Sequence, residues 1–173
     1  MTMGFLGPCG MNTPHTHPRG TELNIVVKGR LVTSFIAENG ARVVHNTGRL
    51  YELAVFPQGA LHMEFNPDCK PAAFVAAFNN EDAATLQAAN AFFELNEDVI
   101  RASLGAQEGD ILIDGKDLDL VRTMIPLNVA KGVESCLKKC GLKKRSWPEI
   151  KQLKRDLIAA GKLPAESEEH VEF

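Results

Sequence analysis

Two histidines and a carboxylate lie within eight residues near the start of this 173-residue chain: His15, His17 and Glu22. In an extended strand, side chains two residues apart point to the same face and stand about 6.6 Å apart. Both imidazoles can therefore approach one ion. The Pro-Arg-Gly sequence that follows His17 can turn the chain, so that Glu22 meets the two rings.

A third histidine, His62, follows the tight-turn sequence Pro57-Gln58-Gly59. Three imidazoles and one carboxylate form a nitrogen and oxygen donor set without thiolate, which suits Mn, Fe, Ni or Zn. Four protein ligands in an octahedral shell leave two positions open, and open positions favour catalysis or ligand exchange. We predict a metal centre made by His15, His17, Glu22 and His62. His45 is predicted to be exposed or in a turn, and His170 to be incidental.

The composition is that of a soluble globular domain, with 45% hydrophobic and 24% charged residues and a formal net charge of -3. This charge argues against general nucleic-acid binding. The basic stretch 131–155 is typical of a solvated helix face. No apolar run approaches the ~20 residues of a membrane helix. The first ten residues lack the basic region of a signal peptide and are too short for one.

Short apolar runs separated by Gly, Pro, Asn and Asp turns predict an all-β core, as a sandwich or barrel. Asn39-Gly40 favours a hairpin turn, and residues 46–48 a second turn. Helical spacing follows after Asn80, a predicted cap. The predicted strands cover 2–9, 23–27, 31–37, 41–45, 50–56, 61–65 and 72–78, and the predicted helices 81–95, 97–104, 117–124, 128–139 and 146–160.

Four cysteines can pair in three ways. Cys136 and Cys140 are four residues apart, and within one helix they would be awkwardly placed to bond to each other. Pairing of each with Cys9 or Cys69 is one interpretation. Four buried free thiols in a reducing compartment are the other.

Two motifs resemble those of the cupin superfamily. Gly10, His15, His17, Glu22 and Gly29 match the first motif, and Pro57, Gly59, His62 and Asn66 match the second. The residues within and around both motifs, 17–23 and 56–59, are similar to those of germin-like proteins. The segments 4–10 and 136–141 fit their spherulin-like branch from fungi and slime moulds.

That resemblance implies a cupin jelly-roll β-barrel with a helical C-terminal extension. It implies Mn²⁺, with Fe²⁺, Ni²⁺ and Zn²⁺ as alternatives, held by the four residues named above. Germins with oxalate oxidase activity convert oxalate and oxygen to carbon dioxide and hydrogen peroxide, and others are described as superoxide dismutases. Asn12 matches an asparagine that points at the substrate, and is equally typical of a turn before Pro14.

We also expect a homo-oligomer, because a barrel short of its first strands would expose an edge that a partner subunit could cover. We expect a small-molecule substrate and, from the charge and the lack of a long apolar run, no nucleic-acid or membrane partner. Family members are commonly secreted, which implies an extracellular protein. Because the sequence shows no signal peptide, a cytoplasmic location is the alternative.

Three features depart from the family pattern. The chain has 14 residues before His15 where the family has several dozen, so we expect a barrel without its first strands. Tyr51 stands where the second motif usually begins with Gly, and residues 142–173 extend beyond the family pattern. The predicted domains are a cupin barrel with its following helices at 1–110 and a helical extension at 111–173.

Three functions follow from these observations. The first is a mononuclear manganese oxidoreductase of the oxalate oxidase or superoxide dismutase kind. The alternative is a non-enzymatic metal-binding structural or stress protein of the spherulin type. A metal-dependent isomerase or dioxygenase on the same barrel is weaker, since one fold hosts many chemistries.

Overall fold

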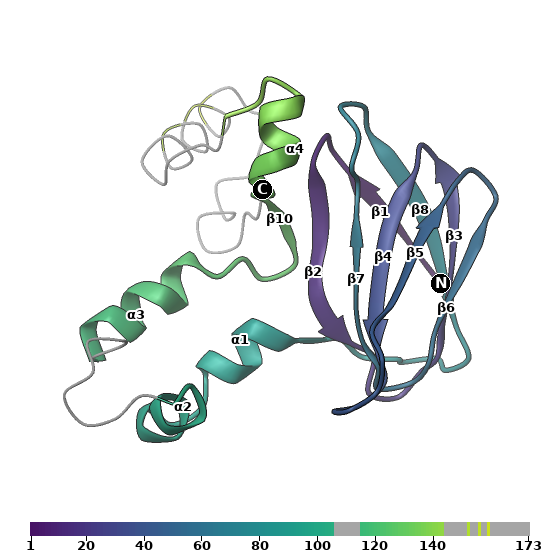
Figure 1. The fold of residues 1–173 in the computed structure, drawn as a ribbon. Helices are drawn as coiled ribbons and strands as arrows, with labels where there is room; N and C mark the ends of the chain where they lie inside the picture. The colour runs from purple at the N-terminus through teal and green to yellow at the C-terminus, as the bar shows by residue number, and fades with distance from the viewer. Residues whose placement is uncertain (106–114, 144–151, 153–155, 157–158, 160–173) are drawn as a thin grey trace.

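The chain folds into two antiparallel β-sheets packed face to face (Figure 1). The structure, a computed structural model, describes residues 1–105 and 115–143, together with 152, 156 and 159. The strands are β1 (Thr2–Leu6), β2 (Gly10–Thr16), β3 (Glu22–Lys28), β4 (Leu31–Ile36), β5 (Val44–Gly48), β6 (Leu53–Phe56), β7 (Leu61–Phe65), β8 (Ala72–Phe78), β9 (Leu86–Gln87) and β10 (Val129–Lys131). The helices are α1 (Ala88–Phe93), α2 (Glu97–Ser103), α3 (Gly115–Met124) and α4 (Glu134–Lys139).

One sheet has the strand order β1-β8-β3-β6, and the other the order β10-β2-β7-β4-β5, with β9 also paired to β2. The predicted all-β core is confirmed, although the two sheets do not close into a continuous barrel. Figure 1 shows α1, α2 and α3 beside the sandwich, and the chain then returns along β10 to the edge of β2.

Alternation along the strands decides which side chains form the interior. In β3, Glu22, Asn24 and Val26 are buried, whereas Leu23 between them is 44% exposed. The apolar core lies between the sheets at one end, and polar residues fill the other. The core cluster comprises Leu6, Val26, Leu31, Ala72, Phe74 and Ala76.

The predicted strand 41–45 and the predicted turn 46–48 are wrong, because the strand begins and ends later in the sequence. The predicted turn at Asn46-Thr47-Gly48 belongs to β5, which pairs with β4 along its length from Val44 to Gly48. The turn comes later, at residues 49–51. Backbone pairing with β4 outweighs the local preference of Asn and Gly for turns.

Among the helices, the predicted segments 97–104 and 117–124 are confirmed as α2 and α3. The predicted helix 81–95 is wrong over its first half. Asn80 accepts a hydrogen bond from the backbone of Asp82 instead of capping a helix, and Leu86 pairs with β2. No helix of the described residues is long and apolar enough to span a membrane.

The predicted helix 128–139 divides into β10 and α4. Its first part adds a strand to β2, and the predicted stop at Gly141 is present, with a φ of +63°. The predicted helix 146–160 falls outside the described residues, apart from three isolated positions. Two disulfides, Cys9–Cys136 and Cys69–Cys140, join α4 to the sandwich, so the interpretation as four free thiols is wrong.

Tyr51 has a φ of +65°, in the left-handed region that glycine adopts most easily. Its backbone N–H donates to Val26 O at 2.7 Å, and its side chain is 73% exposed. The family motif has glycine here because glycine adopts a positive φ without steric cost. Tyr51 adopts the same backbone conformation with strain, because its Cβ is close to the following carbonyl oxygen.

We expect Tyr51→Gly to raise the free energy of unfolding by about 0.5–1 kcal/mol, because relief of strain exceeds the entropy cost of glycine. Urea unfolding measures the change. Tyr51→Ala is the matched control, since it removes the same exposed ring but keeps a Cβ. Equal stability of the two variants would show that backbone strain is not the cause.

Candidate metal centre

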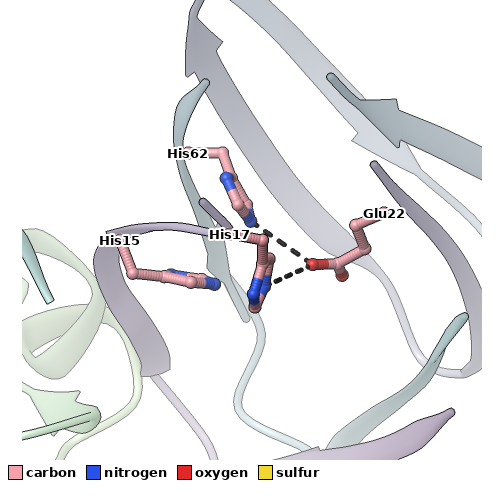
Figure 2. A group of neighbouring side chains, drawn as sticks. All are labelled: His15, His17, Glu22 and His62. Atoms are coloured by element: carbon pink, nitrogen blue, oxygen red, sulfur yellow. Dashed lines mark hydrogen bonds and ion pairs between the residues drawn. The ribbon is translucent and has the colours of Figure 1, made fainter. Parts of the chain in front are cut away.

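Four buried side chains converge at one end of the sandwich (Figure 2). His15 lies on β2, His17 directly after it, His62 on β7 and Glu22 at the start of β3. None is more than 7% exposed. One donor atom from each lies within 4.8 Å of the others. The sequence thus correctly predicted which residues lie together, and metal binding by them is proposed below.

Each imidazole is oriented by a backbone carbonyl. Nδ1 of His15 donates to Thr13 O and Nδ1 of His62 to Ala60 O, both at 2.8 Å. Nδ1 of His17 donates to the carbonyl of Ala84. Because Nδ1 is engaged in every ring, the three Nε2 atoms face the centre, as in protein sites where outer hydrogen bonds fix the tautomer of metal-binding histidines.

Ala84 is a functional residue that the sequence did not indicate. It has a φ of +55° without being glycine, and its carbonyl is the acceptor for His17. A strained backbone of this kind persists only where its surroundings hold it. The segment that continues into β9, paired with His15 and Thr16, provides that support.

A β-bulge sets the direction of His15. Asn12 pairs with Glu64 and His15 with His62, so three steps along β2 match two along β7. Residues three apart on a regular strand face opposite sides. The extra residue at the bulge, beside Pro14, turns both Asn12 and His15 toward the interior.

The two motif loops are bonded directly to each other. Gln58 Nε2 donates to Pro18 O at 2.8 Å, and the Gln58 backbone N–H donates to Thr21 Oγ1 at 3.1 Å. The Gly59 N–H donates to His17 O at 3.0 Å, and its φ of +76° requires glycine in this turn. The loops that carry His17 and lead to His62 therefore move as one unit.

Glu22 is the electrostatic centre of the group. Its Oε2 lies 2.9 Å from Nε2 of His17 and 3.3 Å from Nε2 of His62, while Oε1 accepts from Asn24 at 2.9 Å. Burial alone would raise its pKa, but His17, His62 and Asn24 outweigh burial and lower the pKa of Glu22 to about 2. The carboxylate is ionised at neutral pH.

His15 and His17 differ in their readiness to hold a proton. Burial, followed by repulsion from His62, lowers the pKa of His15 to about 4. For His17, burial opposes a proton, but the hydrogen bonds to Glu22 and Ala84 O prevail and raise its pKa above 6.5. An incoming cation therefore meets a neutral His15 and competes with a proton on His17.

Asn24 and Glu64 form a second buried polar layer behind the centre, and the sequence analysis missed both. Asn24 Nδ2 also reaches Glu64 Oε1, at 3.3 Å, so one amide joins the two carboxyl groups. Burial, followed by repulsion from Glu22, raises the pKa of Glu64 to about 8. The sequence did contain a signal for both. Asn24 lies two residues after Glu22 and Glu64 two residues after His62, so each shares a strand face with one of the predicted ligands.

Asn12 lies at the margin of the centre. Its Nδ2 is 3.5 Å from Nε2 of His15, and its buried Oδ1 has no hydrogen-bond partner. Glu64, directly opposite on β7, also has a buried atom without a partner, Oε2. A proton on Oε2 would make that atom a donor, which fits the raised pKa of Glu64. His45, by contrast, lies exposed on β5, bonded to Ser34.

Two phenylalanines close the apolar side of the centre. Phe56 stacks on His62 with ring centroids 4.4 Å apart, and Phe78 meets His17 edge-on at 4.6 Å. These rings exclude water from one side of the imidazoles and strengthen the electrostatic interactions within the group.

Glu64 predicts a pH dependence of stability in metal-free protein. A carboxyl group whose pKa rises on folding from 4.5 to about 8 contributes stability that is complete below pH 4.5 and lost as the pH rises through 8. Glu64 therefore lowers the unfolding free energy progressively as the pH rises over that window. The free energy of unfolding of Glu64→Gln, measured with urea, should rise relative to that of the wild type as the pH goes from about 5 to about 8. Exposed Glu38→Gln is the control, and a constant gap between Glu64→Gln and wild type would contradict the assignment.

Comparison with known proteins places the chain in a family. The cupin family profile matches residues 1–110. The chain is 44% identical over 142 residues to spherulin-1A of Physarum polycephalum, covering 82% of this chain and 55% of that protein. It is 34% identical over 122 residues to germin-like protein 8-2 of Oryza sativa subsp. japonica, covering 66% and 52%. The chain thus spans about half the length of these curated relatives.

Solved structures give the same result for the fold. An oxalate oxidase with bound glycolate superposes with a TM-score of 0.62 at 24% identity, covering 70% of this chain and 60% of that one. Oxalate decarboxylase from Bacillus subtilis superposes with a TM-score of 0.63 at 19% identity, covering 75% and 31%. At these identities the likeness extends to the fold alone. The predicted resemblance is confirmed, and this chain belongs to the cupin family.

Proposed function

We propose that the chain binds one divalent metal ion, manganese, through His15, His17, Glu22 and His62, and that it is an oxidoreductase of the oxalate oxidase or superoxide dismutase kind. The observation that carries the proposal is the preset donor group: three Nε2 atoms and a carboxylate oxygen converge in a buried space. The donor set has no thiolate, which favours manganese and other borderline-to-hard ions.

The ion, when bound, would supply one-electron chemistry and two coordination positions for exchange. The chain's own residues supply the rest. Nδ1 hydrogen bonds hold the imidazoles in place, and Phe56 and Phe78 exclude water from one side. Asn12 Nδ2, beside His15, is placed to donate a hydrogen bond to a substrate carboxylate. His17 would have to be deprotonated at Nε2 to hold the ion.

A structural role is the second candidate, and one observation favours it. Glu22 belongs to the β3 sheet, whereas His15 and His62 belong to the other sheet. An ion held by all of them would tie together two sheets that do not close into a barrel. Removal of the ion would then lower the melting temperature whether or not the protein turns over a substrate.

An extracellular location is proposed from the family resemblance. The two disulfides fit an oxidising compartment, since such bonds are rare in the cytosol. The exchange of small molecules with the open coordination positions is compatible with either compartment.

Elemental analysis of protein purified without chelator should find about one manganese per chain. His15→Ala should lose it, because the remaining donors leave the shell incomplete. Asn24→Ala should weaken binding by about 10-fold or more, because Glu22 Oε1 loses its orienting hydrogen bond. Affinity should also fall as the pH drops through the raised pKa of His17.

His45→Ala is the matched control, since His45 is exposed, bonded to Ser34 and outside the group. It should keep full occupancy. Undiminished manganese in His15→Ala would refute the proposed shell, and loss in both histidine variants would show that binding is not specific to it.

Two assays on manganese-loaded protein then separate the candidate functions. Hydrogen peroxide formed from oxalate, or accelerated decay of superoxide, supports the oxidoreductase. A chelator-induced fall in melting temperature without either activity supports the structural role. Metal-loaded protein that shows neither turnover nor a change in stability would contradict both.

We further propose that the chain self-associates through the outer side of the β1-β8-β3-β6 sheet. Five large apolar side chains there are each at least 44% exposed, an unusual density for a monomer surface. They lie on three strands of one sheet: β3 and β6 are neighbours, and β8 separates β3 from β1. This outer apolar face comprises Met3, Phe5, Leu23, Leu53 and Val55.

Light scattering coupled to size exclusion should show an oligomer that Leu23→Glu shifts toward monomer, because a charge cannot be buried there without a partner. Leu104→Glu is the control: Leu104 is 50% exposed but follows α2, away from the sheet. A monomeric wild type, or equal effects of the two variants, would contradict the proposal.

A further inference from the structure

The two disulfides form one cluster. Cys9 lies in the β1–β2 turn, Cys69 lies in the β7–β8 turn, and Cys136 and Cys140 lie one helical turn apart at α4. Sγ of Cys9 and Sγ of Cys140 belong to different disulfides yet lie 3.6 Å apart. The sulfurs of Cys9, Cys136 and Cys140 all lie within 4.8 Å of one another.

Three of the four sulfurs already lie about as close together as sulfurs around one ion. A zinc ion with Zn–S bonds of about 2.3 Å in a tetrahedron holds its sulfurs about 3.8 Å apart. The contact between Cys9 and Cys140 already has this length, and Cys69 is joined to Cys140. The two bonded pairs would have to separate, and Cys69, whose Sγ is not among the three that lie within 4.8 Å of one another, would have to approach Cys9 and Cys136. Two turns and the end of a short helix carry these cysteines and would have to make that movement.

The surroundings favour a soft cation held by thiolates. Cys9 is fully buried and Cys136 is 5% exposed, within an apolar cluster that also contains Leu137 and Phe65. Water has little access to compete for the ion. Four thiolates select zinc or another thiophilic ion and reject manganese, so this cluster differs in chemistry from the histidine and glutamate centre.

The cluster has an entry route and balancing charge. A hollow of about 340 Å³ is lined by Cys69 together with Lys70 and Lys139. Cys69 is exposed there, so a dithiol can reach its disulfide. Lys70 and Lys139 would offset only part of the charge of -2 that four thiolates and one Zn²⁺ carry, because Asp68 also lines the hollow and pairs with Lys139 at 3.7 Å. Nζ of Lys139 already lies over this turn, 3.2 Å from Pro67 O.

We propose that Cys9, Cys69, Cys136 and Cys140, once reduced, bind one zinc ion that replaces the two disulfides. Each disulfide takes two electrons and two protons from one molecule of a dithiol reductant, which leaves as its own disulfide. Zinc then binds four thiolates, and four protons pass to solvent. The chain carries a metal centre for reducing conditions beside the one for manganese.

The exchange would preserve the arrangement of the first centre. The cluster anchors α4, and β10 just before it pairs with β2. Asn128 O, at the start of β10, accepts hydrogen bonds from Thr13 N and Thr13 Oγ1 at 2.8 and 2.7 Å. Thr13 O in turn orients His15. Zinc would hold this segment in place before disulfides form or after they are reduced.

Cobalt titration of the full chain tests the proposal. The His15→Ala background removes the other centre, and the protein is reduced anaerobically with a phosphine. We expect one equivalent of Co²⁺ to produce a thiolate-to-cobalt charge-transfer band and the strong visible bands of tetrahedral cobalt, and one equivalent of Zn²⁺ to abolish them. Circular dichroism should show native strand content, with a melting temperature that zinc raises.

Cys69→Ser in the same background should weaken cobalt binding by at least about 10-fold, because one thiolate is lost. The oxidised protein, without thiols, is the control and should give no band. Absence of the band after reduction would overturn the proposal. So would a band of one cobalt per two chains, unchanged affinity in Cys69→Ser, or binding only by unfolded chains.

Discussion

The structure depends on keeping one ionised carboxylate, Glu22, buried between two β-sheets. A charge in that position is costly unless it is fully partnered. His17 and His62 face one oxygen and Asn24 donates to the other, so both oxygens are engaged. Each partner must hold its own orientation, and the loops, the bulge and the outer hydrogen bonds follow from that requirement.

The same requirement explains why the polar groups lie in layers. Glu64 sits behind Asn24, where a second negative charge so near Glu22 would be unfavourable. Its pKa is raised accordingly, and the carboxyl group is neutral at the pH where Glu22 is charged. Two acidic residues of one interior thus take different protonation states because of their surroundings. The centre presents one negative charge to a cation.

The segment made of β10 and α4 is bonded to the same part of the sandwich. Asn66, fully buried, donates to Gly7 O and Lys70 O at 2.8 Å and so joins the two turns that carry Cys9 and Cys69. The disulfides then bring α4 to those turns and hold β10 against β2. The cysteine cluster thereby helps to hold β2, the strand that carries His15, in place.

Local sequence determined the main features. Alternating short apolar runs were enough for an all-β core, since a strand with one buried face needs period-two patterning. The spacing of His15, His17, Glu22 and His62 was enough to bring those four residues together in the prediction. Helices α2 and α3 were predicted from local residue patterns, which act within a few residues.

Contacts between distant segments decided the rest. The predicted turn at 46–48 is strand, and the first half of the helix predicted at 81–95 is a loop followed by β9, because pairing with β4 and β2 outweighs local preference. The disulfide pattern required knowledge of which turns face α4. The roles of Asn24, Glu64 and the Ala84 carbonyl arise only where two sheets meet, because a hydrogen bond across tens of residues leaves no local pattern in the sequence.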